Sequence, residues 1–590
     1  MRLFSTLLFV LVVAFCNKVQ AQDFETATQA VQNMGLGWNL GNTLDANNQS
    51  VTNITSASYW GQQGLESENC WGQPTTKPEL ITMMKNAGFG AIRVPVTWYN
   101  HMDANGNVDA AWMARVKEVV NYVIDAGLYC IINVHHDTGA DSNSSKHWIH
   151  ASTTSYNNNK TRFEGLWRQI ANEFKDYGEK LLFEGYNEML DEYNSWCWAS
   201  RSYNSNIENG YSESIATAAY NAVNNYAQSF VNAVRGTGGN NTKRNLIVNT
   251  YAAASGEGTW NAHLKDPLTQ MKKPSGETNH IIFEVHSYPN ISNLSSAKSA
   301  VNDMLTTLNN NFASKGPVII GEWGTSNVDN GSDYNNNRAN MISFLDHFVK
   351  KAKEKNIATF YWMGLSDGAN RSLPAFNQAD LAETLANAYH GSSSGFAFPT
   401  PDDFQIVYTV NYNSEWGELF LYGDWNNSTS FLLTDYKGIR VELDDDYSGI
   451  LQVKVYGDKV SGDTYKEQHM PLTSGSNTST LYFNASTLGS RVYRITLQNI
   501  TKSSPTAKVK EATLIKTDGT EVPGKITVAW GCTVTTESTP INTGIQLVTP
   551  TITDGDDAIY NLAGQRVSTP SKGSIYIKNG KKFIARKQLF

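Results

Sequence analysis

Residues 112–137, WMARVKEVVNYVIDAGLYCIINVHHD, contain the two patterns that decide the fold. The second part, Leu128–His135, is a nearly continuous apolar run, as expected for a strand buried on both faces of a parallel sheet. The first part, Trp112–Asp125, has a helical period that groups its apolar residues on one face. A helix followed directly by such a strand is typical of a βαβ unit. The grouped residues are Met113, Val116, Val119, Val120 and Val123.

The same alternation of short apolar runs and helical patterns extends from Gly35 to about Ala388. Other clear helical patterns are Ser214–Val234 and Asn337–Lys353. Eight such units predict an α/β fold of the closed (β/α)8 TIM barrel type. The alternative is an open doubly wound sheet, but no G-x-G-x-x-G follows the first strand. The eight candidate strands are Gly35–Leu40, Gly90–Val96, Leu128–His135, Leu181–Asn187, Asn245–Asn249, His280–His286, Pro317–Glu322 and Ala358–Met363.

The composition changes after the barrel. Residues 391–401 are rich in Gly, Ser and Pro, which is typical of a linker. Beyond them, short β-branched and aromatic runs alternate with Asn, Asp, Gly and Ser clusters, and this predicts an all-β jelly-roll sandwich over residues 402–540. Its candidate strands are Phe404–Tyr412, Leu419–Leu421, Ile439–Leu443, Gly449–Tyr456, Thr480–Phe483, Arg491–Leu497 and Lys508–Leu514.

The two ends of the chain carry patterns of their own. Residues 1–21 combine a basic start, an apolar run at Leu7–Cys16 and a small-residue site ending at Ala21, which predicts a signal peptide. The mature catalytic domain is then expected over residues 22–390, and the protein is expected to be secreted or on the outer cell surface. Residues 541–590 have hairpin punctuation and, from Tyr560 onward, seven Lys or Arg and no acid. This segment is expected to be a small β module rather than a nucleic-acid-binding arm.

Composition narrows the classes of ligand. The chain has 590 residues, 40% of them hydrophobic, and a formal charge of −8, which argues against nucleic acid as a partner. Aromatic residues make up 11%, which suits a neutral ligand with flat apolar faces, such as a sugar chain, although most of them belong to the core. We expect no transmembrane segment, no cofactor and no metal, and a monomeric protein. The mature chain's four cysteines show no metal-ligand spacing, and whether Cys70 and Cys197 pair stays open.

Barrel active sites lie at the carboxyl ends of the strands, where polar residues here replace the apolar pattern. Lone glutamates, Glu188 and Glu322, occur at the ends of the fourth and seventh candidate strands. Glycoside hydrolysis needs two carboxyl groups beside the bond, about 5–5.5 Å apart when the configuration is retained. The alternative is that either Glu simply ends a strand as a solvated charge. The other polar strand-end residues are Arg93, His135, His136, Asp137, Asn187, His286, Tyr288 and Trp362.

Seven short pieces of sequence, which include these strand-end residues, occur in an order that resembles glycoside hydrolase family 5 cellulases over about residues 34–390. Each piece alone is weakly specific, but seven in family order at the expected strand ends make the resemblance specific. One departure is Met189, where the family usually has proline after the Asn-Glu pair, so the substrate is less well defined. The seven pieces are 37–45, GWNLGNTLD; 92–96, IRVPV; 133–136, NVHH; 187–188, NE; 286–288, HSY; 321–322, GE; and 361–362, YW.

The resemblance implies a role for each carboxyl group. Glu322 would be the nucleophile, held ionised and aimed by Arg93 and Tyr288. Glu188 would be the general acid/base, kept protonated in the free enzyme by partial desolvation and the nearby negative nucleophile. Asn187 would bond the sugar 2-hydroxyl, a contact that strengthens in the transition state.

It also implies supporting roles for histidine and tryptophan. His135 and His286 would bond substrate hydroxyls or the two glutamates, and Trp362 would be the platform under the sugar at the cleaved bond. For His136, a hydrogen-bonded core residue is the alternative. Independently of the resemblance, several loop tryptophans are expected to line an open cleft, because the loops after barrel strands build the site. The sequence does not show which of the candidates do so; they are Trp71, Trp98, Trp148, Trp196, Trp198 and Trp260.

The leading hypothesis is therefore an endo-acting, retaining β-1,4-glucanase. β-Mannan, xyloglucan or mixed-linkage glucan is the alternative substrate, and a non-catalytic glycan-binding surface protein is the alternative class. The sandwich resembles carbohydrate-binding jelly rolls in a general way, with Trp416, Tyr422 and Trp425 as stacking candidates, or is a spacer whose aromatics are core. The tail resembles the sorting domains of Bacteroidetes-type secreted proteins, which implies contact with a secretion machinery.

Overall fold

The computed structural model of the chain divides into two compact units, residues 1–400 and 401–590. It describes residues 24–48, 57–139, 147–191, 193, 196–199, 211–325, 337–392, 395–444, 451–472 and 477–540, and the backbone of 559–560, 575–578 and 581–584. The predicted signal peptide lies outside the described residues.

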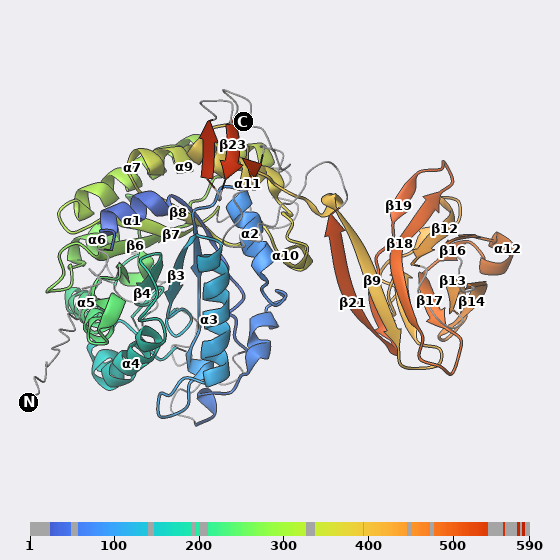
Figure 1. Ribbon diagram of the computed structural model, residues 1–590, viewed down its shortest axis with the longest axis horizontal. Helices are drawn as coiled ribbons and strands as arrows, with labels where there is room; N and C mark the ends of the chain where they lie inside the picture. The colour runs from blue at the N-terminus through green and yellow to red at the C-terminus, as the bar shows by residue number, and fades with distance from the viewer. Residues whose placement is uncertain are drawn as a thin grey trace, which may run out of the picture. The chain divides into compact units, whose positions relative to one another are not determined.

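Eight parallel strands close into a barrel in sequence order, with β1 paired to both β2 and β8 (Figure 1). Every residue of these strands is buried, which explains why their sequences are continuous apolar runs. The predicted (β/α)8 barrel is confirmed, and the open sheet is excluded. The strands are β1 (Leu36–Asn39), β2 (Ala91–Val94), β3 (Tyr129–Asn133), β4 (Leu181–Glu184), β5 (Leu246–Asn249), β6 (Ile281–Ser287), β7 (Val318–Trp323) and β8 (Ala358–Tyr361).

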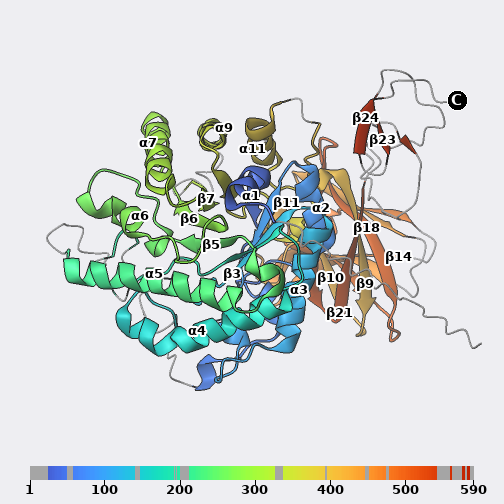
Figure 2. The ribbon, with the colours of Figure 1, turned by 60° about the vertical axis from the view of Figure 1, so that its left-hand side comes forward.

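Helices surround the strands on the outside of the barrel (Figure 2). The helix before β3 begins where the Asp109 side chain accepts the N–H of Trp112, and it buries the predicted valine face, whereas Met113 lies at the edge of that face and is only half-buried. The helices are α1 (Ala27–Met34), α2 (Pro78–Asn86), α3 (Ala110–Asp125), α4 (Thr153–Glu173), α5 (Glu213–Arg235), α6 (Asp266–Gln270), α7 (Leu294–Phe312), α9 (Arg338–Glu354), α10 (Ala369–Ser372) and α11 (Ala379–His390).

The amino-terminal end of the barrel is filled by apolar side chains. Val31 and Met34 of α1 join one buried cluster with interior residues such as Ile247 and Phe360. The Phe360 ring lies where a Cβ at position 37 would be, 2.2 Å from one of its atoms, so only Gly37 fits there. Because this end is filled by core, the carboxyl ends of the strands are left for polar side chains.

The second unit contains antiparallel sheets, as expected from its sequence. One sheet has the order β14-β13-β17-β10-β20, the other has the order β15-β12-β18-β9-β21 with β19 beside β18, and both contribute to one apolar cluster. The strands are β9 (Phe404–Tyr412), β10 (Glu418–Tyr422), β11 (Phe431–Leu432), β12 (Tyr436–Leu443), β13 (Leu451–Ser461), β14 (Thr464–Leu472), β15 (Thr478–Tyr482), β16 (Arg491–Val492), β17 (Arg494–Asn499), β18 (Thr506–Lys516), β19 (Glu521–Pro523), β20 (Thr527–Trp530) and β21 (Cys532–Pro540), with the short helix α12 (Ala485–Leu488). The tail adds β22 (Ile559–Tyr560), β23 (Ile575–Lys578) and β24 (Lys581–Ile584).

Part of the expected linker is not free chain. The N–H of Ala397 donates to the carbonyl of Asn86 (3.1 Å), and the N–H of Phe376 donates to that of Pro399 (2.7 Å). Aromatic side chains at 396 and 398 anchor this segment on the barrel unit. The Gly/Ser/Pro composition alone did not indicate this contact.

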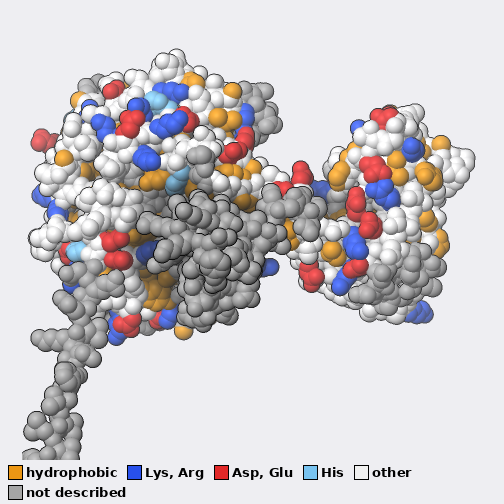
Figure 3. All heavy atoms as spheres, turned by 45° about the horizontal axis from the view of Figure 1, so that its top comes forward, with side chains coloured by type: hydrophobic (Ala, Val, Ile, Leu, Met, Phe, Trp, Pro, Cys, Tyr) orange, Lys and Arg blue, Asp and Glu red, His pale blue; other side chains and the backbone are white. Residues whose placement is uncertain are grey.

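None of the described helices is both long and apolar enough for a bilayer crossing. On the surface seen in Figure 3, acidic and basic side chains are interspersed over both units.

Candidate active site

The polar strand-end side chains converge at the carboxyl end of the barrel. Glu322 lies within β7 and His286 within β6, whereas β4 ends at Glu184, earlier than expected. Asn187 and Glu188 therefore lie in the loop after β4, where the N–H of Asn187 donates to the carbonyl of Val134 (2.9 Å). The loop backbone, rather than the strand, sets the position of the acid.

The two glutamates face each other across this mouth. One carboxylate oxygen each from Glu188 and Glu322 and a ring nitrogen of His286 all lie within 4.8 Å of one another. Glu322 is 5% exposed, and the Glu188 side chain is 19% exposed. Carboxylate oxygens this close fit the retaining arrangement, whose carboxyl groups lie about 5–5.5 Å apart, better than the wider pair of roughly 6.5–9.5 Å that admits water.

Arg93 organises the floor of the site. Its side chain is fully buried, and Nη1 donates to Glu322 Oε1 (2.7 Å) and to Asn39 Oδ1 (3.0 Å). Nη2 donates to Asn187 Oδ1 (2.8 Å) and Glu184 Oε1 (2.8 Å), and Nε donates to Glu184 Oε2 (2.6 Å). A guanidinium has five N–H groups, and all five are used here. Arg93 therefore acts both as a structural ion-pair residue and as a site residue, since the same network fixes the position of the Glu322 carboxylate.

The nucleophile candidate receives a hydrogen bond on each oxygen. The Tyr288 hydroxyl donates to Glu322 Oε2 (2.8 Å), opposite the Arg93 contact on Oε1. Burial raises the pKa of Glu322, and His286, Arg93 and Tyr288 oppose that rise. Burial and the neighbouring carboxylates raise the pKa of Tyr288 well above its usual value, so it stays a neutral donor.

His286 links the two glutamates. Its Nδ1 lies 2.8 Å from Glu188 Oε1 and 3.5 Å from Glu322 Oε2, and its Nε2 lies 3.4 Å from Glu284 Oε1. Burial lowers the pKa of His286, but Glu322, Glu188 and Glu284 together raise it to about 10. The ring is therefore cationic in the free protein and donates from both nitrogens.

His135 differs from His286 in that its ring is neutral. Asn133 accepts the N–H of Val96 with its Oδ1 (3.0 Å), so its amide nitrogen faces His135 Nδ1 at 3.0 Å and donates to it. The ring proton is therefore on Nε2, which lies 3.9 Å from Glu322 Oε1. Burial, with His136, Arg93 and His286 nearby, lowers the pKa of His135 well below its usual value. The neutral ring offers one N–H toward the space above the nucleophile.

Two further predicted residues lie nearer the rim. His136 Nε2 lies 3.7 Å from Asp45 Oδ2, and the His136 ring lies 5.2 Å from the Trp71 ring. The Trp362 ring is nearly parallel to the His135 ring, at 6.0 Å and 6°. It lies against Gly41, where a Cβ would come within 2.9 Å of the ring. The structure brings all nine predicted site residues into one region, and the platform role of Trp362 stays a prediction.

The loop tryptophans divide into two groups. Trp98 and Trp148 are fully buried, so they are not among the candidates that line the cleft. Their indole N–H groups donate to the Asn133 carbonyl (2.8 Å) and to Asp137 Oδ1 (2.6 Å), which makes them part of the core. Trp71 is 40% exposed and Trp260 is 61% exposed. Both remain available to a ligand.

Sequence reasoning missed a buried acidic layer beneath the site. Glu184 and Glu284 are both fully buried and flank Arg93. Burial raises the pKa of Glu184, but Arg93, Asn133 and His286 together lower it to below its usual value, whereas burial and Glu184 raise the pKa of Glu284 to about 7. A single acid inside the apolar runs LLFE and IIFEV was the available signal.

Metal binding is not needed to satisfy these groups. Two clusters bring three possible ligands together within 4.8 Å, Glu188 with His286 and Glu322, and Asp45 with His135 and His136. In the first, Glu188 and His286 already form a direct hydrogen bond. In the second, both Asp45 oxygens accept backbone N–H groups, from Asn42 and Thr43.

Cys70 and Cys197 are free thiols in the structure.

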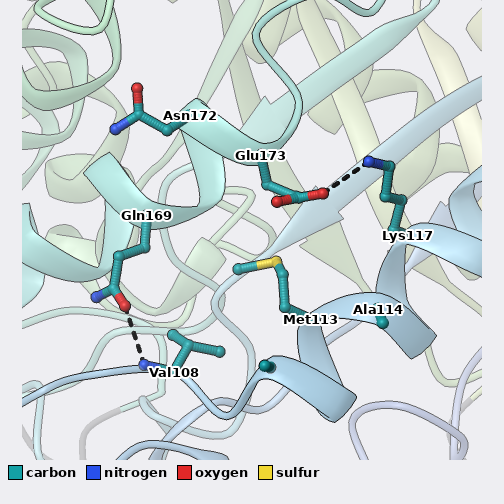
Figure 4. A pocket seen from close by; sticks show the side chains of 8 residues that line it. Val108, Met113, Ala114, Lys117, Gln169, Asn172 and Glu173 are labelled. Atoms are coloured by element: carbon teal, nitrogen blue, oxygen red, sulfur yellow. Dashed lines mark hydrogen bonds and ion pairs between the residues drawn. The ribbon is translucent and has the colours of Figure 1, made fainter.

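A separate surface pocket of about 630 Å³ lies between α3 and α4 (Figure 4). Across it, Lys117 pairs with Glu173 (2.7 Å), and the N–H of Val108 donates to Gln169 (3.0 Å). None of its lining residues comes from the carboxyl end of a strand. This pocket is therefore not part of the candidate site.

Comparisons with known proteins agree with this geometry. Residues 44–367 match the family Cellulase (glycosyl hydrolase family 5). The chain is 33% identical over 395 residues to endoglucanase A of Clostridium longisporum, covering 63% of this chain and 68% of the relative. It is also 33% identical over 386 residues to endoglucanase 1 of Ruminococcus albus, covering 62% and 81%.

Solved structures are similar over the barrel. A GH5-4 broad specificity endoglucanase from an uncultured bacterium is 59% identical with a TM-score of 0.59, covering 64% of this chain and 98% of that one. A family 5 enzyme of Prevotella bryantii, in complex with a xyloglucan tetradecasaccharide, is 41% identical with a TM-score of 0.53, covering 62% and 99%.

Proposed function

The chain belongs to glycosyl hydrolase family 5, and we propose that it cleaves internal β-1,4-glucan linkages with retention of the anomeric configuration. The observation that carries this proposal is the approach of Glu188 and Glu322 oxygens to within 4.8 Å. Such a pair can attack and protonate the same linkage without water between them. Binding alone would not need this pair, which disfavours a non-catalytic glycan-binding protein.

In the first step, the Glu322 carboxylate attacks the anomeric carbon while Glu188 gives its proton to the departing glycosidic oxygen. The bond to the leaving chain breaks, and an ester to Glu322 forms. Arg93 and Tyr288 hold the two Glu322 oxygens, which fixes the direction of attack. The attack neutralises Glu322, so Glu188 then has one negative charge fewer next to it.

In the second step, Glu188 takes a proton from water, and that water attacks the anomeric carbon and releases Glu322. Two displacements at one carbon restore the starting configuration. The hydrogen bond between His286 and Glu188 (2.8 Å) orients the carboxyl group for giving and for taking the proton. Loss of the Glu322 charge favours the ionised form of Glu188 that this second step requires.

Two uncharged donors are placed to bind sugar hydroxyls. Asn187 uses its amide oxygen to accept from Arg93, so its NH2 group is left for the 2-hydroxyl. The His135 Nε2–H is available beside Glu322 for a second hydroxyl. Both side chains are fixed by the network below them, so they need no reorganisation when charge develops at the anomeric centre.

The relatives favour a substrate range wider than cellulose. One is named a broad specificity endoglucanase and is 59% identical, and another, 41% identical, was solved with a xyloglucan oligosaccharide. We infer that this enzyme acts on xyloglucan as well as on unbranched β-1,4-glucan. Product analysis on carboxymethyl cellulose, mixed-linkage glucan, xyloglucan and glucomannan tests this range, and hydrolysis of glucomannan alone would reject it.

Proton NMR of the first product tests the mechanism. Retention predicts that the new reducing end appears as the β-anomer before mutarotation. Initial release of the α-anomer would contradict the roles of both glutamates. The measurement needs only wild-type protein and a soluble cello-oligosaccharide.

We further propose that the protein is exported and acts as a monomer. The basic, apolar and small-residue order of residues 1–21 supports a cleaved signal, and the tail at 541–590 supports contact with a secretion machinery. Amino-terminal sequencing of protein from the culture medium should begin at Gln22. Retention of the intact chain in the cytoplasm, even with the signal in place, would contradict this proposal.

A further inference from the structure

The five-stranded sheet of the second unit has a polar face that is not solvated. Leu419, Val453 and Leu497 point to the apolar cluster, so the alternate residues lie on the opposite face. On that face Glu418 lies opposite Gln498 in register. The outer face of an antiparallel sheet normally carries exposed polar residues, yet Glu418 is 2% exposed and Gln498 is 5% exposed.

These residues form one cross-strand hydrogen-bond network. Glu418 Oε1 accepts from the Tyr456 hydroxyl (2.5 Å) and from Gln498 Nε2 (2.7 Å), and Gln498 Oε1 accepts from Gln452 Nε2 (2.6 Å). Three strands therefore hold the Glu418 carboxyl group in one orientation. Such order on a face turned away from the core indicates a built site rather than a solvated surface.

The network is incomplete within the described part of the chain. Glu418 Oε2, Arg494 Nε and Thr496 Oγ1 are buried, and none of these three atoms has a hydrogen-bond partner. Buried polar atoms are paired in the great majority of cases. The three atoms are an acceptor, a donor and a hydroxyl, a mixture that sugar hydroxyls can match because each one both donates and accepts.

Exposed tryptophans border the network. Trp530 is the cross-strand partner of Glu418 and is 45% exposed, and Trp416, two residues before Glu418, is 50% exposed. Trp425 is 44% exposed and lies against Arg494, whose guanidinium carbon is 4.7 Å from its ring centroid. Tyr422, the third stacking candidate from the sequence, instead packs against the apolar cluster, because a bulge after Phe420 turns it inward.

We propose that this face of the β14-β13-β17-β10-β20 sheet is a second binding site for β-glucan, apart from the catalytic barrel. Sugar rings stack on Trp530, Trp416 and Trp425, and rotation of Trp530 lets hydroxyls reach Glu418 and Gln498. The charged groups on this face are Glu418, Arg494 and the Lys454–Glu467 ion pair (3.1 Å), and they leave the site without strong net charge. This suits a neutral polysaccharide better than a phosphate or nucleic acid. The choice of β-glucan as the ligand rests on the proposed function.

Affinity electrophoresis of the full chain in gels containing xyloglucan or mixed-linkage β-glucan tests the site. Glu322→Gln is used as the background so that the polysaccharide stays intact. We expect Trp530→Ala and Gln498→Ala each to weaken retention at least about fivefold, and Trp530→Phe, which keeps a stacking face, to preserve most of it. The matched control is Tyr482→Ala, since Tyr482 is 65% exposed on the other sheet and should not change retention. Unchanged retention in Trp530→Ala and Gln498→Ala would overturn the inference.

A second readout separates this inference from the proposed function. In the active chain, Trp530→Ala should leave hydrolysis of a short soluble cello-oligosaccharide unchanged and slow that of insoluble glucan. Equal rates on insoluble glucan for wild type and Trp530→Ala would count against the site while leaving the enzyme intact. If no β-glucan is hydrolysed by wild type, the proposed function fails, but a loss of retention confined to the sheet-face variants would still support the second site.

Discussion

The barrel mouth and the polar face of the five-stranded sheet each bury an arginine and an acid, but they satisfy these groups differently. Arg93 uses all five N–H groups on Glu184, Asn39, Asn187 and Glu322. Among the described residues, Arg494 donates one hydrogen bond, to Asn427 (3.3 Å), and its guanidinium is otherwise enclosed by aromatic rings. Its Nε has no partner among the described residues.

The difference between the two networks corresponds to two different functions, catalysis and reversible binding. Stabilising charge in a transition state requires dipoles and ions that are already fixed, because reorganisation during the reaction would raise the barrier. Reversible binding of a hydroxyl-rich chain instead gains from polar atoms that the free protein leaves unpaired. The barrel mouth is therefore built for preorganisation, and the sheet face is built for exchange of partners with a ligand.

The largest expected effect is on Glu322, the proposed nucleophile. Glu322→Gln keeps the shape of the side chain but cannot form the ester, so we expect kcat to fall by about 10⁴-fold or more. Polysaccharide binding in the sheet-face assay should remain. The control is Glu354→Gln on α9, whose side chain is 57% exposed and should leave kcat unchanged. Hydrolysis of a soluble cello-oligosaccharide is the measurement, and wild-type rates in Glu322→Gln would reject the assignment.

The two buried acids provide the next largest contrast. Glu184→Gln leaves Arg93 without its bidentate partner in a fully buried site, so we expect a loss of about 3–5 kcal/mol in unfolding free energy. Glu418→Gln keeps one oxygen as an acceptor for Tyr456 and Gln498, and we expect it to cost less than about 1 kcal/mol. Urea denaturation of both variants measures the difference. Equal losses would show that the two networks are organised alike.

The cationic His286 makes the barrel mouth sensitive to pH. Its pKa is raised to about 10, above the ordinary value of 6.5, so protonation favours the folded state. That stabilisation is complete below the unfolded pKa of about 6.5 and is lost as pH rises through the folded pKa. Between about pH 7.5 and about pH 9.5 we expect wild type to lose on the order of 2–3 kcal/mol more than His286→Gln.

This pH effect is measured as the difference between the two unfolding curves, which removes groups that titrate in both proteins. Glu188, Glu284 and Glu322 surround the ring, and Glu284, whose pKa is raised to about 7, titrates just below this window. Parallel curves for wild type and His286→Gln would contradict a cationic ring.

The sequence predicted the barrel because its strands are buried on both faces and so carry an unbroken apolar signal. It also located Glu188 and Glu322, since each stands where such a run ends. It did not reveal Glu184 and Glu284, because a single acid inside an apolar strand gives no sign of which partner neutralises it. It also could not separate Trp98 and Trp148 from the loop tryptophans that stay exposed. Only the fold shows that their N–H groups meet buried acceptors.

The C-terminal sheets were harder to interpret because the central strands β10, β13 and β17 of the five-stranded sheet are largely buried on both faces. One of these faces is apolar, and the other is mainly polar. Alternation alone would place Glu418 and Gln498 in water. Their register partners, and the bulge that turns Tyr422 inward, depend on strand pairing that no local pattern specifies. Sequence therefore identified aromatic candidates for binding but could not separate Trp416 and Trp425 from Tyr422.

The smallest expected effect concerns one glycine beneath the catalytic pair. A Cβ at Gly321 would lie 1.5 Å from Glu284 Oε1, so Gly321→Ala must displace that carboxyl group from Arg93 and His286. We expect a loss of about 2 kcal/mol in unfolding free energy, within the range for overpacking. The matched control is Gly165→Ala in α4, where a Cβ meets nothing within 4 Å. Helix propensity predicts that this control gains about 0.5–1 kcal/mol. If both substitutions changed stability by the same amount, Gly321 would be no more tightly packed than an exposed helix position. Close packing would then not be what fixes the barrel network, and the contrast with the sheet face would lose its physical basis.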